Sequence, residues 1–234
     1  MHGNLNRVIA ALDFPSLHEA LGFVKRSGDE LLWCKVGMEL FTREGYPVIE
    51  ALKREKKMVF LDLKFHDIPN TVGGAVKSAV AHGVDMLTVH ASGGSEMLRA
   101  AASVAKASGT KVVAVTILTS LNESDLRVFG TTGPVSSMVE RLTEMALHSG
   151  VDGIVCSPLE VAHLRNTFGG DFIAVTPGIR LPDDEKGDQK RVTTPEEAFE
   201  AGADFIVVGR SLTAVADPRK RLREIALRFG QSKT

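Results

Sequence analysis

The sequence has very little cysteine and few aromatic residues. Of its 234 residues, two are cysteine, one is tryptophan and one is tyrosine. Two cysteines are too few for a disulfide scaffold. Because Cys34 and Cys156 both lie in apolar, strand-like runs, we interpret them as buried free thiols of a protein from a reducing compartment, which predicts a cytoplasmic location.

Excess charge of one sign and long apolar runs are also missing. The chain has 28 Lys and Arg residues against 29 Asp and Glu residues, a net charge of −1. This balance argues against binding to a nucleic acid or a membrane through bulk charge. No apolar stretch approaches the roughly 20 residues of a membrane span, and residues 1–7 lack the basic region of a signal peptide. We therefore expect neither a nucleic acid nor a membrane as partner.

Short apolar runs recur about every 30 residues along the chain. Each is rich in Val, Ile, Leu or Phe and ends at a turn or polar residue, which is typical of buried parallel strands. The runs are Val8–Asp13, Leu31–Gly37, Met58–Lys64, Met86–Ala91, Lys111–Leu118, Gly153–Ser157, Phe172–Gly178 and Phe205–Arg210.

Segments with helical periodicity separate these runs, and most begin at proline and are followed by glycine. Ser16 and Glu19 form a capping-box pattern at the first of them. The segments are Ser16–Arg26, Pro69–His82, Ser95–Ser108, Pro134–Ser149, Pro158–Phe168, Pro195–Ala201 and Pro218–Phe229.

Eight strands alternating with helices, at about 29 residues per unit, predict an α/β fold of the (β/α)8 TIM-barrel type. We expect residues 1–234 to form one catalytic domain. A doubly wound sheet is the alternative, but no Gly-x-Gly-x-x-Gly follows the first run. The longest irregular stretches, 119–133 and 178–194, follow strands, on the face where a barrel carries its active site.

Charged residues gather at the ends of the first three strands: Asp13, Lys35, Asp62 and Lys64. Residues two apart share one face of a strand, so Asp62 and Lys64 are expected to face the barrel interior and Phe65 the helices. Buried charges are costly unless they are paired. The cluster therefore predicts a catalytic site; the alternative is an ion-pair network that only closes the barrel mouth.

The loops after the last two strands suggest a phosphate site. Thr176–Arg180 and Val208–Ser211 each place a glycine and an arginine beyond a strand end. In barrels these two loops commonly bind phosphate through backbone N–H groups and charged donors. The alternative is a pair of C-cap glycines with solvated arginines. No spacing of His, Cys or Glu suggests zinc, and no Gly-x-Ser-x-Gly motif suggests a covalent nucleophile.

The long charged motif at Asp62–Thr71 (DLKFHDIPNT) resembles the signature of the orotidine 5′-phosphate decarboxylase family. The resemblance extends in order over roughly residues 8 to 218, without departure at a functional position, and the length is similar to that of the compact bacterial form. The other matching segments are Ala11–Asp13, Lys35–Phe41, Thr176–Arg180, Asp188–Gln189 and Val207–Ser211.

The resemblance implies decarboxylation of orotidine 5′-monophosphate to UMP and CO2, the last step of de novo pyrimidine nucleotide synthesis. It implies that Lys64 protonates C6, that Asp62 lies beside the substrate carboxylate, and that no metal or organic cofactor is needed. Asp67 is expected to complete the charged network in the site of the neighbouring subunit of a homodimer, together with Ile68 and Thr71.

The resemblance also assigns substrate contacts. Lys35 and Asp13 are expected to bind ribose hydroxyls, Thr119 the pyrimidine edge, and Pro177 an apolar wall near the departing CO2. The phosphate is expected to be held by Arg180, Gln189, Gly209 and Arg210. Two alternatives are kept: a Mg²⁺-dependent sugar-phosphate decarboxylase or aldolase of the same broader family, which also carries Asp-x-Lys-x-x-Asp, and a catalytically silent nucleotide-binding barrel.

Overall fold

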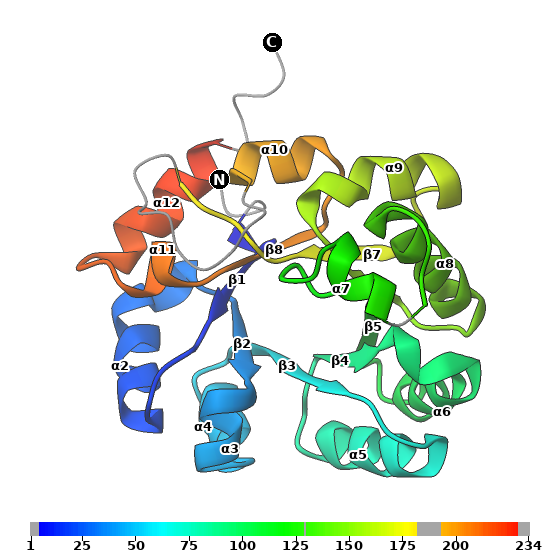
Figure 1. Cartoon of the computed structure of the whole chain (residues 1–234). Coiled ribbons are helices and arrows are strands. Elements are labelled where there is room, and N and C mark those ends of the chain that lie inside the picture. Colours follow the sequence, from blue (N-terminus) through cyan, green and yellow to red (C-terminus); the bar gives the residue numbers. More distant parts are fainter. Residues whose placement is uncertain (1–4, 129, 182–192, 229–234) are drawn as a thin grey trace.

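The computed structural model describes residues 5–128, 130–181 and 193–228, which form eight parallel strands closed into a barrel with helices around it (Figure 1). The strands are β1 (Val8–Ala11), β2 (Trp33–Gly37), β3 (Met58–Phe65), β4 (Met86–His90), β5 (Lys111–Val115), β6 (Gly153–Val155), β7 (Ile173–Thr176) and β8 (Phe205–Val208).

Closure of the sheet distinguishes the two predicted architectures. Each strand pairs in parallel with the next in sequence, and β8 returns to β1, where Val208 lies opposite Ala10. A doubly wound sheet would leave two open edges. The (β/α)8 prediction is therefore confirmed and the doubly wound alternative is wrong.

Helices surround the strands, and most begin where the sequence predicts. Ser16 caps the first of them by accepting the Glu19 N–H at 3.3 Å, as the capping-box pattern indicates. The α-helices are α2 (Leu17–Ser27), α3 (Met38–Glu44), α4 (Pro47–Arg54), α5 (Pro69–Ala81), α6 (Gly94–Lys106), α7 (Glu123–Val128), α8 (Val135–His148), α9 (Pro158–Phe168), α10 (Pro195–Glu200), α11 (Arg210–Thr213) and α12 (Pro218–Arg228). Two short 3₁₀ helices are also present, η1 (Gly28–Glu30) and η2 (Ala91–Gly93).

Two stretches differ from the predicted segments. The crossover from β2 to β3, for which no helix bounds were predicted, contains two helices, α3 and α4. Gly45, at φ 64°, ends α3, and Pro47 starts α4, so the turn interrupts the apolar periodicity that would have marked one longer helix. The stretch 119–133, expected to be irregular, contains the short helix α7.

Most strands end one to three residues before the predicted boundary. The run 111–118 pairs only as Lys111–Val115, and the run 8–13 only as Val8–Ala11. Of the remaining residues of these runs, Asp13, Ile117 and Leu118 border the cavity described below. Asp13 and Thr119 therefore lie just beyond strands rather than within them.

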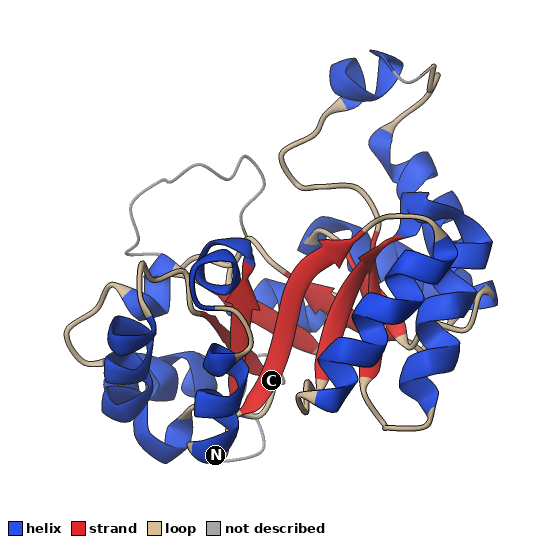
Figure 2. Ribbon diagram, turned by 90° about the horizontal axis from the view of Figure 1, so that it is seen from below, coloured by secondary structure: helices blue, strands red, loops and turns tan. Residues whose placement is uncertain are grey.

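Two apolar layers hold the barrel together, one inside it and one between the strands and the helices that surround them in Figure 2. Alternation along each strand sends successive side chains to the two layers. In β3, Phe60 is buried in the interior layer, whereas Leu61, Leu63 and Phe65 pack in the outer layer. The predicted outward direction of Phe65 is thus confirmed. The positions that follow Phe60 on the interior side of β3 are occupied by the charged residues Asp62 and Lys64.

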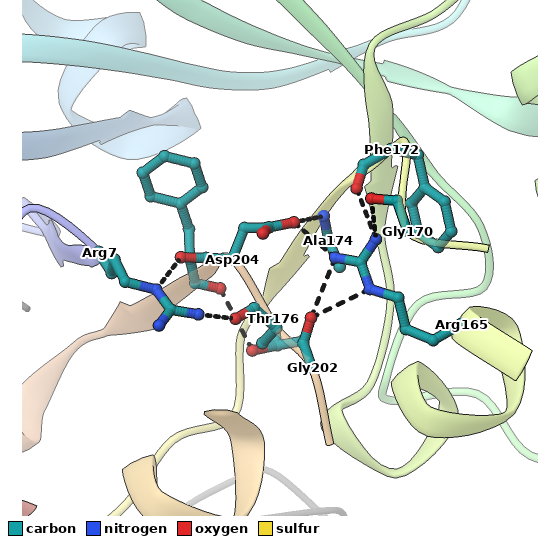
Figure 3. Close-up of polar contacts among 10 residues, drawn as sticks. Arg7, Arg165, Gly170, Phe172, Ala174, Thr176, Gly202 and Asp204 are labelled. Atoms are coloured by element: carbon teal, nitrogen blue, oxygen red, sulfur yellow. Dashed lines mark hydrogen bonds and ion pairs between the residues drawn. The ribbon is translucent and has the colours of Figure 1, made fainter. Parts of the chain in front are cut away.

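The amino-terminal end of β7 and β8 is tied by polar contacts remote from the carboxyl ends of the strands (Figure 3). Arg165 of α9 donates to the carbonyl oxygens of Phe172 at 2.7 Å and Gly202 at 3.0 Å, and pairs with Asp204 at 2.6 Å. Asp204 also accepts the Ala174 N–H at 2.8 Å. These contacts satisfy backbone groups where loops enter the sheet, so they serve stability rather than chemistry.

Cys34 and Cys156 are both buried and form no disulfide, as predicted. Burial raises the pKa of the Cys34 thiol to about 12, because the thiolate would lose its solvation in the apolar layer. Cys34 is therefore an inert packing residue. In the described part of the chain, no helix is both long and apolar enough to span a membrane.

Candidate active site

A cavity of about 540 Å³ opens at the carboxyl ends of the strands, on the face where barrels carry active sites. Its walls combine apolar side chains from the strands with charged groups at the strand ends. The lining residues are Ala11, Asp13, Lys35, Phe60, Asp62, Lys64, Val115, Ile117, Leu118, Thr119, Val155, Cys156, Pro177, Gly178, Arg180, Val207, Gly209 and Arg210.

The four charged residues predicted from the strand ends form one alternating network. The Lys35 Nζ atom lies 3.2 Å from Asp13 Oδ1 and 3.6 Å from Asp62 Oδ2. The Lys64 Nζ atom lies 2.8 Å from Asp62 Oδ1. Two carboxylates and two ammonium groups thus alternate along one wall of the cavity, and each charge has a partner of opposite sign.

Burial within the network is uneven. The side chain of Lys35 is 11% exposed and that of Asp62 is 14% exposed, whereas Asp13 at the rim is 56% exposed. Lys64 is 27% exposed. Its ammonium group is accessible from the cavity while remaining paired, which suits a group that acts on a bound molecule.

The backbone at Lys64 has a conformation that the sequence does not signal. Its φ is 52°, in the left-handed region that non-glycine residues seldom adopt, at a cost on the order of 1 kcal/mol. The pairing of β3 with β4 is also irregular there, because Leu61 lies opposite Leu87 but Phe65 lies opposite Val89. Strain of this kind is concentrated at functional sites.

Gly37, at the end of β2, lies close to the side chains of Lys35 and Asp13, which leave no room for a side chain there. A Cβ atom on Gly37 would lie 2.7 Å from the Lys35 Nζ atom and 3.3 Å from Asp13 Oδ1. Any side chain there would displace the ammonium group from the two carboxylates. Gly37 therefore leaves room for the charged network.

The predicted phosphate residues gather at the ends of β7 and β8. Gly178, Arg180, Gly209 and Arg210 all line the cavity there. The Arg180 N–H donates to the Thr193 carbonyl oxygen at 3.0 Å, which brings the two ends of the 178–194 stretch together. Gln189, the remaining predicted phosphate residue, lies outside the described residues.

Thr119 and Pro177 also line the cavity, but three predicted site residues do not. Asp67, Ile68 and Thr71 lie at the start of α5 and are exposed, with Ile68 at 67%. The carboxylate of Asp67 accepts the Ile68 N–H at 2.6 Å. A role for these residues in this cavity is not supported within one chain.

Two histidines stack beside the network. The rings of His66 and His90 lie 5.2 Å apart between centroids, and His90 Nδ1 lies 2.8 Å from the Ser92 hydroxyl. Burial lowers the pKa of His90, and the nearby positive charges of His66 and Lys64 lower it further. His90 is therefore neutral at neutral pH and adds no competing positive charge next to Lys64.

Several residues of the site region, among them Val155, Cys156 and Thr88, escape prediction from the sequence. Val155 and Cys156, at the end of β6, line the cavity, although we interpreted Cys156 only as a buried thiol. Thr88 of β4 is fully buried below the network and hydrogen-bonds to it. A threonine or cysteine inside an apolar strand carries no local signal of such a role, because the role depends on which strand lies beside it.

Comparisons with known proteins agree with this geometry. A family model described as the orotidine 5′-phosphate decarboxylase / HUMPS family matches residues 6–225. The orotidine 5′-phosphate decarboxylases of Nitrosospira multiformis and Anaeromyxobacter sp. (strain K) are 45% and 50% identical to the chain. Each alignment covers 94% of this chain, with 92% of the first relative and 96% of the second.

A solved structure agrees as well. The crystal structure of orotidine 5′-phosphate decarboxylase from Lactobacillus acidophilus superposes with a TM-score of 0.84 at 40% identity, covering 95% of this chain and 98% of that one. The match therefore extends over nearly the whole barrel. The chain therefore belongs to the orotidine 5′-phosphate decarboxylase / HUMPS family.

Proposed function

We propose that this barrel converts orotidine 5′-monophosphate to UMP and CO2, the last step of de novo pyrimidine nucleotide synthesis, without a metal and with Lys64 as the proton donor. One observation carries the proposal: the Lys64 ammonium group borders the cavity and is paired at 2.8 Å with Asp62. The curated relatives that bear the decarboxylase name support the choice of substrate.

The chemistry demands a fixed cation. Loss of CO2 from C6 leaves an electron pair in the plane of the pyrimidine ring, orthogonal to the π system, so delocalisation cannot spread it. A positioned ammonium group stabilises this charge as it develops. Lys64 then donates its proton to C6 and becomes a neutral amine.

The other charged residues are proposed to order the substrate. Asp62, next to Lys64, would lie beside the carboxylate that leaves and hold the ammonium group in place. Lys35 and Asp13, nearer the rim, would bind the ribose hydroxyls. Thr119 would contact the pyrimidine edge and Pro177 the departing CO2, since both line the cavity.

The phosphate is proposed to bind at the ends of β7 and β8, against Gly178, Gly209, Arg180 and Arg210, with Gln189 as a further ligand. The phosphate would contribute to catalysis although it would not touch C6. Binding energy from a non-reacting group lowers the barrier when it orders the groups that act in the transition state.

The charge pattern favours a metal-free reaction over the Mg²⁺-dependent alternative. Both carboxylates of the network already face ammonium groups, at 3.2 Å for Asp13 and 2.8 Å for Asp62. A divalent cation bound there would have to displace or repel Lys35 and Lys64. The silent nucleotide-binding alternative is disfavoured because Asp62 and Lys64 are both present.

The direct test is the loss of ultraviolet absorbance of orotidine 5′-monophosphate with purified protein in excess EDTA. We expect rapid turnover that added Mg²⁺ does not increase. Turnover of a sugar phosphate that depends on Mg²⁺ would support the alternative within the family. Tight nucleotide binding without turnover would support the silent barrel.

We also propose that the active unit is a homodimer in which Asp67, Ile68 and Thr71 enter the site of the second copy. Their exposure, at the start of α5 and outside the cavity of their own chain, supports this. Asp67 would add a third carboxylate to the network, beside Lys64 of the other copy.

Mixing two inactive variants tests the shared site. Lys64→Ala and Asp67→Ala are each expected to be inactive, but a mixed dimer contains one site with both residues intact. After random exchange in an equal mixture, about one quarter of wild-type activity should return, because a two-fold dimer has two equivalent sites. No recovery, with exchange verified by native mass spectrometry, would argue against the shared site.

Two coarser proposals accompany the function. We propose that residues 1–234 act as a single catalytic domain, since the described elements form one barrel. The cytoplasm is the proposed compartment, and it is supported by the two buried cysteines, which form no disulfide.

A further inference from the structure

We propose that Thr88 is a positioning residue for the Lys64–Asp62 pair: its hydroxyl group holds the left-handed backbone of Lys64 and the carboxylate of Asp62 at the same time. The inference rests on the proposed function of Lys64. Thr88 is fully buried and does not line the cavity, so it acts through its neighbours rather than on the substrate.

The first support is the hydrogen bonding of the hydroxyl group. Thr88 Oγ1 accepts the backbone N–H of Lys64 at 2.8 Å and donates its single proton to Asp62 Oδ1 at 3.1 Å. Asp62 Oδ1 also receives the Lys64 ammonium group at 2.8 Å. The backbone of Lys64, the Thr88 hydroxyl, the Asp62 carboxylate and the Lys64 ammonium group therefore form a closed ring of hydrogen bonds.

The second support is the irregular pairing of β3 and β4. Between the pairs Leu61–Leu87 and Phe65–Val89, β3 has three residues and β4 has only Thr88. The extra length of β3 forms a bulge that frees the Lys64 N–H from the regular ladder. Such an N–H needs a partner when it is buried, and the Thr88 side chain provides one.

The third support is the rigidity of threonine. Its β-branched side chain has restricted χ1 freedom in a strand, so the hydroxyl group is held in one direction. Met86, two residues earlier, packs in the interior layer, which directs Thr88 to the same side of β4, below the charged network.

Two pairs of variants isolate the hydroxyl group. Compared with the wild type, Thr88→Val keeps the shape of the side chain and removes the hydroxyl oxygen. Thr88→Ser and Thr88→Ala both lack the Thr88 methyl group and differ from each other only in the hydroxyl group. Thr110→Val is the matched control, because Thr110 is also buried and donates to a carbonyl oxygen, of Val84, at the amino-terminal end of β5.

We expect Thr88→Val to lower kcat for orotidine 5′-monophosphate roughly 10- to 100-fold, since a hydrogen bond to a charged group is lost. KM should stay within about threefold, because no substrate contact is removed. Thr88→Ser should retain most of the activity that Thr88→Ala loses. Thr110→Val should lower the melting temperature without lowering kcat.

Equal kcat for wild type and Thr88→Val would overturn the proposal, as would equal losses in Thr88→Ser and Thr88→Ala. A crystal structure of Thr88→Val supplies a readout that does not need turnover: the Lys64 Nζ–Asp62 Oδ1 contact should be lost, and an unchanged contact would refute the positioning role. Failure of the wild-type protein to decarboxylate the substrate would instead overturn the proposed function.

Discussion

Replacing Lys64 by alanine is expected to lower kcat for orotidine 5′-monophosphate by at least roughly 10⁴-fold, because it removes the cation and the proton donor together. A positioned general acid contributes about 10²- to 10⁴-fold, and stabilisation of developing charge is often as large. Among the described residues that line the cavity, the other ammonium group is that of Lys35, which is held between Asp13 and Asp62 and cannot substitute. Single-turnover decay of substrate absorbance measures the loss.

The fold should tolerate the same change. Lys64 is partly exposed to the cavity, and its removal relieves the left-handed backbone only slightly, so the melting temperature should shift little. Lys53→Ala is the matched control, because Lys53 pairs with Asp85 at 2.7 Å, outside the cavity. That variant should keep wild-type kcat. Turnover by Lys64→Ala within tenfold of wild type would exclude Lys64 as the proton donor.

Replacing Arg210 by alanine is expected to lower kcat/KM roughly 10²- to 10³-fold, while the melting temperature stays nearly unchanged. Arg210 is exposed at the start of α11 and lines the cavity beside Gly209, so it contributes little to the core. A guanidinium group forms strong, charge-assisted contacts with phosphate. Steady-state kinetics with orotidine 5′-monophosphate, together with thermal unfolding, separate the two effects.

A truncated substrate identifies the group that Arg210 recognises. Orotidine, which has no phosphate, should react slowly with the wild-type protein, and Arg210→Ala should not slow it further. Arg223→Ala is the control, because Arg223 pairs with Glu30 on the outer surface and should leave both reactions unchanged. Equal losses with both substrates in Arg210→Ala would mean that Arg210 does not act through the phosphate.

Local patterns in the sequence were sufficient to predict the architecture. Runs of apolar residues, each ended by a turn or polar residue, predicted all eight strands, and the helix Pro158–Phe168 has the predicted bounds. The motif at Asp62–Thr71 indicated the family, and the alternation of β3 predicted that Asp62 and Lys64 meet. These features depend on neighbours in the chain, where the periodicity of strands and helices acts directly.

The sequence alone thus determined the barrel, the charged strand ends and the pair of glycine–arginine loops. Only the tertiary structure decided that Lys64 adopts a left-handed backbone, that Thr88 holds it, and that Gly37 leaves space for the Lys35 ammonium group. Each of these depends on the register between strands or on how closely two segments approach. Closure of the barrel sets the register and the close approaches, because it brings together residues that are distant in the chain. Lys64 and Thr88, about 24 positions apart, are an example, and no local periodicity encodes their contact.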